Sequence, residues 1–156
     1  MVREEDIVRS FIDSGIIRGW FIREVPVGLN VYKRLFSKAL GKNELEKFFK
    51  VFSRRIDLIC VEGVEGPLLR PTPEEWLELR RKLKGCNVWL FEVKIVLNAE
   101  AVGEILINEY LFRKDNPEIN VAGKGIICWE IGPPSSILVK DACNAYGIKV
   151  FTIKQK

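Results

Sequence analysis

The stretch "WLFEVK" (residues 89–94) has the pattern of a buried β-strand, yet its second half carries an acid and a base. Glu92 and Lys94 stand two residues apart, so in a strand both side chains point to one face, which Leu90 shares. The other face would be filled by Trp89, Phe91, Val93 and Ile95. Burying two charges without further partners is rarely a net stabiliser. The pair therefore needs either solvent or additional charged groups beside this strand.

A second acid lies in an equally apolar run upstream, "RRIDLICVE" (residues 54–62). Asp57 stands early in this run, which otherwise predicts a nearly continuous buried strand. Two carboxylates that enter one sheet from neighbouring strands repel each other unless a cation lies between them. A divalent metal bound by Asp57 and Glu92 would remove that repulsion, and oxygen ligands suit Mg²⁺ or Mn²⁺.

Helix and strand patterns alternate along the rest of the chain. Helices are predicted over residues 3–15, 72–85, 99–112 and 135–147, and two short basic helices hinged at Gly41 over residues 30–52. Strands are predicted over residues 20–28, 54–62, 87–96, 124–131 and 148–153. Because strands alternate with helices in the second half, we expect a mixed or parallel sheet covered by helices.

Local signals mark several helix ends. Gly15 is the expected end of the first helix, and Gly85 that of the helix that begins after Thr72. Thr72 and Glu75 have the spacing of a capping box at the start of that helix. Ser135 is the expected cap of the last helix.

Composition limits the possible chemistry. The chain has 156 residues, 47% hydrophobic and 29% charged, which are values typical of a globular domain. No apolar run approaches the roughly 20 residues needed to cross a bilayer, and "MVREED" is not a signal peptide, so we expect a cytoplasmic protein without membrane contact. Histidine is absent, which excludes histidine triads, histidine metal ligands and histidine acid–base catalysis.

The cysteines and the net charge give weaker indications of the kind of site and the kind of partner. Four widely spaced cysteines without a C-x-x-C pair favour buried thiols over a zinc site, and a disulfide stays open only for an oxidising compartment or a hyperthermophile. Glutamine is scarce while Glu, Lys and Arg are plentiful, as in thermophilic proteins. The net charge of +4 is compatible with a nucleic-acid surface if the positive charge gathers on one side.

The order of these features resembles the PD-(D/E)xK nuclease superfamily, which includes archaeal Holliday-junction resolvases. The residues that carry the resemblance are Asp57 on one strand and Glu92 with Lys94 on the next, after an acidic first helix. Ile56 stands where the family's motif has Pro. The resemblance spans most of the chain; only a basic insertion at about 30–52 and the helix at 72–84 fall outside it. It implies an α/β fold of the restriction-endonuclease type, with an α-β-β-β-α-β core, a mixed central sheet flanked by helices, and a single domain over residues 1–156.

The resemblance also implies an activity, metal-dependent hydrolysis of phosphodiester bonds. Asp57, Glu92 and the carbonyl of Val93 would bind Mg²⁺ or Mn²⁺, and Lys94 would orient the attacking water or the scissile phosphate. Glu4, in the first helix, is expected to ligate a second metal or to hold a metal-bound water. Glu104 stands where relatives often have another polar residue, and it is expected to contact the metal-site residues without binding the metal itself.

Nucleic acid is the expected partner, DNA more than RNA. Arg54 and Arg55 directly precede Asp57, where they could meet the phosphate backbone. Further backbone contacts are expected from Lys38, Arg80 and Arg81. No helix-turn-helix or zinc-finger signature is visible, so we expect recognition of structure or ends rather than of a defined sequence. A homodimer with paired sites is compatible with such a nuclease.

Other interpretations stay open. The chain could be a non-catalytic member of the same fold that binds nucleic acid or a protein, or a structural subunit with a mixed-charge interface. Asp57 could be a strand-end acid satisfied by the backbone or by Arg55, and Glu92 with Lys94 an exposed ion pair. An acid such as Glu4 in a first helical turn is favoured by the helix dipole whatever its function. Trp76, near a basic helix, is the one tryptophan with a candidate role in base stacking.

Overall fold

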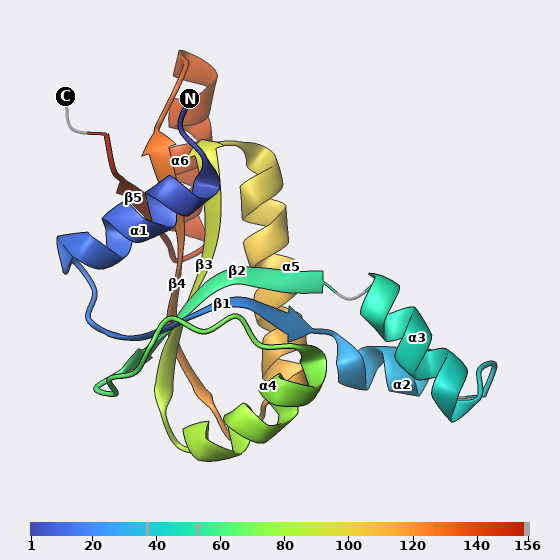
Figure 1. Cartoon of the computed structure of the whole chain (residues 1–156). Helices are drawn as coiled ribbons and strands as arrows, with labels where there is room; N and C mark the ends of the chain where they lie inside the picture. The colour runs from blue at the N-terminus through green and yellow to red at the C-terminus, as the bar shows by residue number, and fades with distance from the viewer. Residues whose placement is uncertain (37, 53, 155–156) are drawn as a thin grey trace.

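The chain forms one five-stranded mixed sheet in the order β1-β2-β3-β4-β5 (Figure 1). The computed structural model describes residues 1–36, 38–52 and 54–154. The strands are β1 (Gly19–Val27), β2 (Arg54–Glu62), β3 (Asn87–Val96), β4 (Asn120–Glu130) and β5 (Ile148–Thr152). Strand β2 is antiparallel to both of its neighbours, β1 and β3, whereas β3, β4 and β5 are parallel to one another. The expected α/β class with a mixed sheet is confirmed.

Helices cover both faces of this sheet (Figure 1). The helices are α1 (Glu4–Ser14), α2 (Leu29–Phe36), α3 (Lys42–Phe52), α4 (Pro73–Leu79), α5 (Ala99–Asp115) and α6 (Pro134–Ala145). Apolar side chains of α1 pack on one face, and those of α4, α5 and α6 pack on the other. Helices α5 and α6 connect the parallel strands, since a parallel pair needs a crossover whereas an antiparallel pair does not.

Helices α2 and α3, which we call the arm, lie between β1 and β2 in the chain and project beside the sheet (Figure 1). The arm has its own aromatic cluster, in which the Tyr32 ring meets those of Phe36, Phe48 and Phe49 at centroid distances of 5.5 to 6.0 Å. The Asp115 carboxylate, at the end of α5, accepts hydrogen bonds from the backbone at the start of the arm. The donors are the amides of Gly28, Leu29 and Asn30, at 2.7, 3.3 and 3.0 Å.

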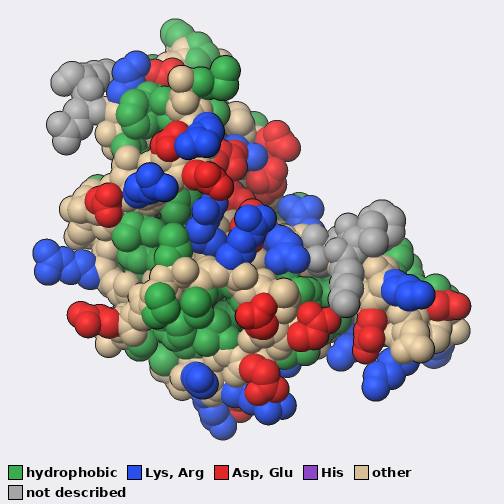
Figure 2. All heavy atoms as spheres, in the orientation of Figure 1, with side chains coloured by type: hydrophobic (Ala, Val, Ile, Leu, Met, Phe, Trp, Pro, Cys, Tyr) green, Lys and Arg blue, Asp and Glu red, His purple; other side chains and the backbone are tan. Residues whose placement is uncertain are grey.

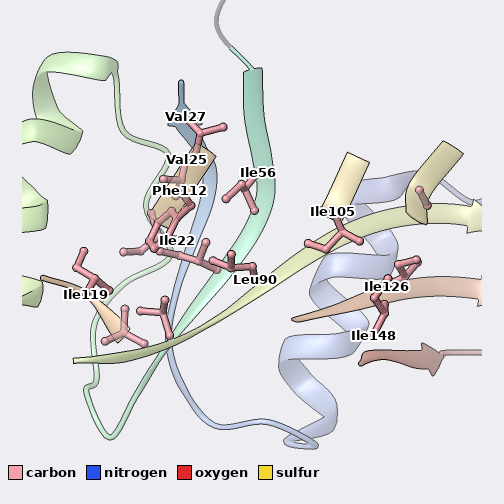
Figure 3. Close-up of a cluster of buried hydrophobic side chains, with 14 of the residues drawn as sticks. Ile22, Val25, Val27, Ile56, Leu90, Ile105, Phe112, Ile119, Ile126 and Ile148 are labelled. Atoms are coloured by element: carbon pink, nitrogen blue, oxygen red, sulfur yellow. The ribbon is translucent and has the colours of Figure 1, made fainter. Parts of the chain in front are cut away.

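Two hydrophobic clusters, one on each face, fix the strands. In the larger one, Ile22 and Ile56 of β1 and β2 meet Ile105 and Phe112 of α5 (Figure 3). In the smaller one, under α1, the Phe11 ring lies 5.3 Å from the rings of both Phe91 and Phe151. Fully burying one such side chain contributes about 1.5–3 kcal/mol, so these two clusters rather than local propensity hold the strand register.

Most predicted helices and strands occupy their expected places, and three local predictions were wrong. The predicted helix to residue 85 is α-helical only to Leu79, because the chain tightens into a 3₁₀ turn over Arg80–Leu83. Its predicted capping box at Thr72 is confirmed. Ser135 is not a cap: α6 begins at Pro134, whose fixed φ suits a first turn, so Ser135 lies inside the helix. Ile95 was expected on the apolar face of its strand but is exposed, because the hydrophobic cluster under α1 includes no β3 residue beyond Val93.

Several other expectations concern burial. All four cysteines are free thiols; Cys60, Cys128 and Cys143 are buried, and Cys86 is half-buried. Trp76 is buried against Phe112, with ring centroids 6.2 Å apart, so it is a packing residue that no nucleobase can reach. Within the described ranges, no helix combines the length and the apolar character that crossing a bilayer requires.

Candidate active site

The two predicted carboxylates lie where β2 and β3 separate. Regular pairing of these strands runs from Val61–Val88 to Leu58–Phe91. It stops one position before Asp57 and Glu92, which this register would place opposite each other. At that point the Oδ2 atom of Asp57 accepts a hydrogen bond from the backbone N–H of Val93 at 2.8 Å. A side-chain carboxylate thus satisfies a β3 amide where regular strand pairing ends.

Glu92 is the buried member of the pair, with 1% of its surface exposed. Burial, and after it the negative charge of Asp57, raise the pKa of Glu92 to about 10, although the hydrogen bond from Asn108 acts in the opposite direction. Glu92 is therefore protonated at neutral pH when no cation is bound. Two carboxyl groups this close do not both ionise readily unless a cation lies between them.

Lys94 pairs with α5 and not with Glu92. Its Nζ lies 3.3 Å from the nearer carboxylate oxygen of Glu104, and both side chains are about three-quarters buried, at 21% and 26% exposed. Burial alone would lower the pKa of Lys94, but the charge of Glu104 and its hydrogen bond outweigh that effect and raise the pKa. The ammonium group therefore stays charged beside Asp57 and Glu92, which we call the carboxyl pair. The interpretation of Glu92 and Lys94 as an exposed ion pair was wrong.

Glu4 lies on the rim of this site, in the exposed first turn of α1. Partial desolvation raises the pKa of Glu4, the charges of Asp57 and Glu104 raise it further, and Lys94 opposes them. Glu4 is thus within electrostatic range of the other site residues. Within residues 1–36, 38–52 and 54–154, however, no three or more Asp, Glu or Cys side chains form a group that could hold a metal ion. Asp57 and Glu92 are the acids that the fold brings together.

Asn108 is a site residue that the sequence analysis missed. This side chain is 2% exposed, and its Nδ2 donates a hydrogen bond of 2.7 Å to Oε1 of Glu92. Its Oδ1 accepts one of 2.9 Å from Nε of Arg54. Asn108 therefore links the predicted phosphate-binding Arg54 to the buried carboxyl group. The signal was available, since Asn108 is a polar residue on the apolar stripe of α5 that includes Ile105 and Phe112.

The other predicted nucleic-acid contacts are spread over three places. Nη1 of Arg55 donates to the backbone carbonyl of Glu24 at 3.1 Å, next to the carboxyl pair. Nη1 of Arg80 donates to the carbonyl of Asp115 at 3.0 Å, at the opposite end of α5 from Glu104. Exposed Arg81 pairs with Glu78, and Lys38 is exposed on the turn between α2 and α3.

The charge on this side of the molecule is mixed. On the face that Figure 2 shows, Lys and Arg side chains gather over β1 and β2, between α1 and the arm, with Asp and Glu side chains next to them. Arg54 lies at the start of β2. A phosphate group approaching the carboxyl pair would therefore meet cations close to the acids.

The chain matches no protein-family model, no curated protein and no solved structure. The chemistry of the site therefore decides which function fits best.

Proposed function

We propose that this chain is a metal-dependent nuclease that hydrolyses phosphodiester bonds in nucleic acid, DNA rather than RNA. The observation that carries the proposal is that Asp57 and the buried Glu92 lie together where β2 and β3 separate, with the charged Lys94 beside them. When α2, α3 and α4 are left out as additions to the core, the element order is α1-β1-β2-β3-α5-β4, which supports the proposal because the PD-(D/E)xK superfamily has an α-β-β-β-α-β core. The positions of Asp57 on β2 and of Glu92 with Lys94 on β3 agree with that motif.

The side chains present fit a divalent cation. Glu92 retains its proton at neutral pH because burial and the neighbouring charge of Asp57 disfavour its ionised form. A cation bound by Asp57, Glu92 and the carbonyl of Val93 would take the place of that proton. These are oxygen donors, as Mg²⁺ and Mn²⁺ prefer, and Mg²⁺ sites in nucleotide-processing enzymes commonly have only one or two carboxylates, with water and phosphate as the other ligands.

Each charged residue then has a separate task. The bound cation would supply Lewis acidity, which lowers the pKa of a bound water and offsets the charge of the phosphate. Lys94, held by Glu104 at 3.3 Å, would orient the attacking water or stabilise the scissile phosphate. Arg54, fixed by Asn108, would hold a phosphate of the backbone. Glu4, on the rim, would hold a second cation or its water.

The test is a cleavage assay on supercoiled, linear and branched DNA and on RNA, with Mg²⁺ or Mn²⁺. We expect cleavage of DNA that falls by a factor on the order of 100 or more in Asp57→Asn and Glu92→Gln, because each change removes an anionic ligand of the cation. Glu130→Gln is the matched control: it also removes one carboxylate, but an exposed one that pairs with Lys154.

Calorimetric titration with Mg²⁺ and Mn²⁺ complements the assay. Binding of the ion to the parent protein, lost in Asp57→Asn and retained in Glu130→Gln, is expected. Salt-sensitive DNA binding without cleavage under any condition would instead indicate a non-catalytic nucleic-acid-binding protein. Absence of ion binding, with and without DNA, would overturn the proposal.

A further inference from the structure

Glu24, in β1, has a backbone conformation that side-chain-bearing residues rarely adopt. Its φ is 51°, and it is the sole non-glycine residue with a positive φ among the residues that the structure describes. Such a conformation is disfavoured for a glutamate and persists only where the surroundings enforce it. Residues of this kind cluster at functional sites, so the position of Glu24 relative to the carboxyl pair matters.

Glu24 lies opposite Asp57 in the register of the sheet. The β1–β2 ladder pairs Arg23 with Leu58 and Val25 with Ile56, so Glu24 and Asp57 occupy the position between these two pairs. This is also where β2 leaves β3, since the β2–β3 ladder ends at Leu58. Asp57 therefore lies at an interruption of pairing on both sides of β2.

The alternation of side chains also reverses at this position. Residues two apart in a regular strand share a face. In β1, however, Ile22 and Val25 both point into the same core cluster, as Ile56 and Ile59 do in β2 (Figure 3 labels all but Ile59). In β1 across Glu24, and in β2 across Asp57, successive side chains on this face are therefore three residues apart instead of two. The reversal lets β1 and β2 keep burying aliphatic side chains while Asp57 is released from regular pairing.

Two contacts of Glu24 and one of its neighbour Arg23 hold this part of β1 in place. Its carbonyl accepts the 3.1 Å hydrogen bond from Arg55, and its carboxylate forms an ion pair with Arg70. The preceding residue is fixed as well, since the amide of Arg23 donates to the carbonyl of Leu69 at 2.7 Å. Arg55 therefore supports the strand next to the site, in addition to its expected role with phosphate.

We infer that Glu24 is a positioning residue, whose left-handed backbone aims Asp57 at Glu92 and at the amide of Val93. An effect of Glu24 on cleavage rests on the proposed nuclease function, whereas its role in positioning Asp57 does not depend on that function. If the backbone conformation of Glu24 is what matters, the effect of a substitution depends on how readily the new residue adopts a positive φ. Glycine and asparagine adopt a positive φ readily, whereas the β-branched valine resists it.

The test compares Glu24→Gly, Glu24→Gln and Glu24→Val by hydrogen exchange at the Val93 amide. We expect exchange roughly tenfold faster in Glu24→Val, as for loss of one hydrogen bond, and little change in Glu24→Gly. Glu24→Gln removes the charge that pairs with Arg70 and should also leave exchange unchanged. The Leu90 amide, in the part of β3 that pairs regularly with both neighbouring strands, reports whether each variant is folded. Glu24→Ala replaces the valine variant if that one does not fold.

In the cleavage assay, Glu24→Val should lower kcat by roughly tenfold or more with little change in KM, because a small misplacement of a catalytic group affects the chemical step. Glu24→Gly should restore kcat. Equal exchange at Val93 in the glycine and valine variants would overturn the inference, and so would a glutamine variant that behaves like the valine one. If the parent protein cleaves nothing, the proposed function fails, but exchange at Val93 still decides the role of Glu24.

Discussion

The Glu92 carboxyl group couples the stability of the protein to pH. Its pKa is raised from an ordinary value of 4.5 to about 10, because burial and Asp57 disfavour the charged form. Between these two values the folded protein keeps a proton that the unfolded chain releases. Because the folded state then binds more protons, the free energy of unfolding decreases as the pH rises from about 4.5 to about 10.

Replacing this group should remove that dependence. Glu92→Gln keeps the shape and the acceptor for Asn108 but cannot ionise, so it should be more stable than the parent protein at pH 8.5 in EDTA. A gain of at least about 3 °C in Tm is expected, with little difference near pH 4.5. Thermal unfolding across this pH range is the measurement, with Glu130→Gln as the control. Parallel pH profiles for Glu92→Gln and the parent protein would contradict the assignment of a raised pKa.

Among single residues, the sequence pointed to those with a recognisable charge pattern. Glu92 and Lys94 stood out because charges interrupt an apolar strand. Lys94, however, has Glu104 as its partner, ten residues along the chain, and that pairing depends on how α5 packs on β3. Asn108 was overlooked because a neutral amide gives a weaker signal than a charge, although it occupies the buried face of α5.

At the scale of elements, the arm depends on one carboxylate outside it. Asp115 accepts three backbone amides at the start of α2, as a capping side chain does within its own helix. Burial raises the pKa of Asp115, and these hydrogen bonds act against that effect. The position of the arm is thus tied to the end of α5, the helix that also carries Glu104 and Asn108.

Asp115→Ala should therefore loosen the arm before the rest of the fold. The loss of a capping carboxylate costs about 1–2 kcal/mol, and the amides left without an acceptor would favour detachment of α2. Thermal unfolding measures the loss of stability, and limited proteolysis should cut within the arm faster than in the parent protein. Asp141→Ala, at an exposed position on α6, is the control. Equal proteolysis rates in the two variants would argue against Asp115 as the anchor.

Helices and strands were predictable from the sequence where the local hydrophobic pattern agrees with the packing of the folded chain. The runs over Arg54–Glu62 and Asn87–Val96 are strands with the expected limits, because central strands buried on both faces are apolar almost throughout. The helix after Thr72 was predicted too long, because packing and not composition decides where its last turn tightens. The left-handed residue in β1 had no signal at all, since glutamate is an ordinary strand residue there.

At the scale of the whole molecule, the arm carries exposed cations, among them Lys38. Lys38→Glu should weaken DNA binding and lower the slope of log Kd against log salt by about 1 if the arm contacts phosphate. Lys140→Glu changes the net charge equally, at an exposed position on α6, and is the matched control. Binding titrations at several salt concentrations provide the measurement. An equal effect of both changes would indicate an influence of net charge alone.

The sequence by itself determined the α/β class, the location of most helices and strands, and the acids and the base that form the site, because hydrophobic period and isolated charges are local properties. Only the tertiary structure decided that Asp57 and the buried Glu92 lie together, that Lys94 pairs with Glu104, and that Asn108 and Glu24 support the site. Those features depend on where β2 leaves both of its neighbours and on how α5 crosses the sheet. They arise from packing between segments far apart in the chain, which no local pattern encodes.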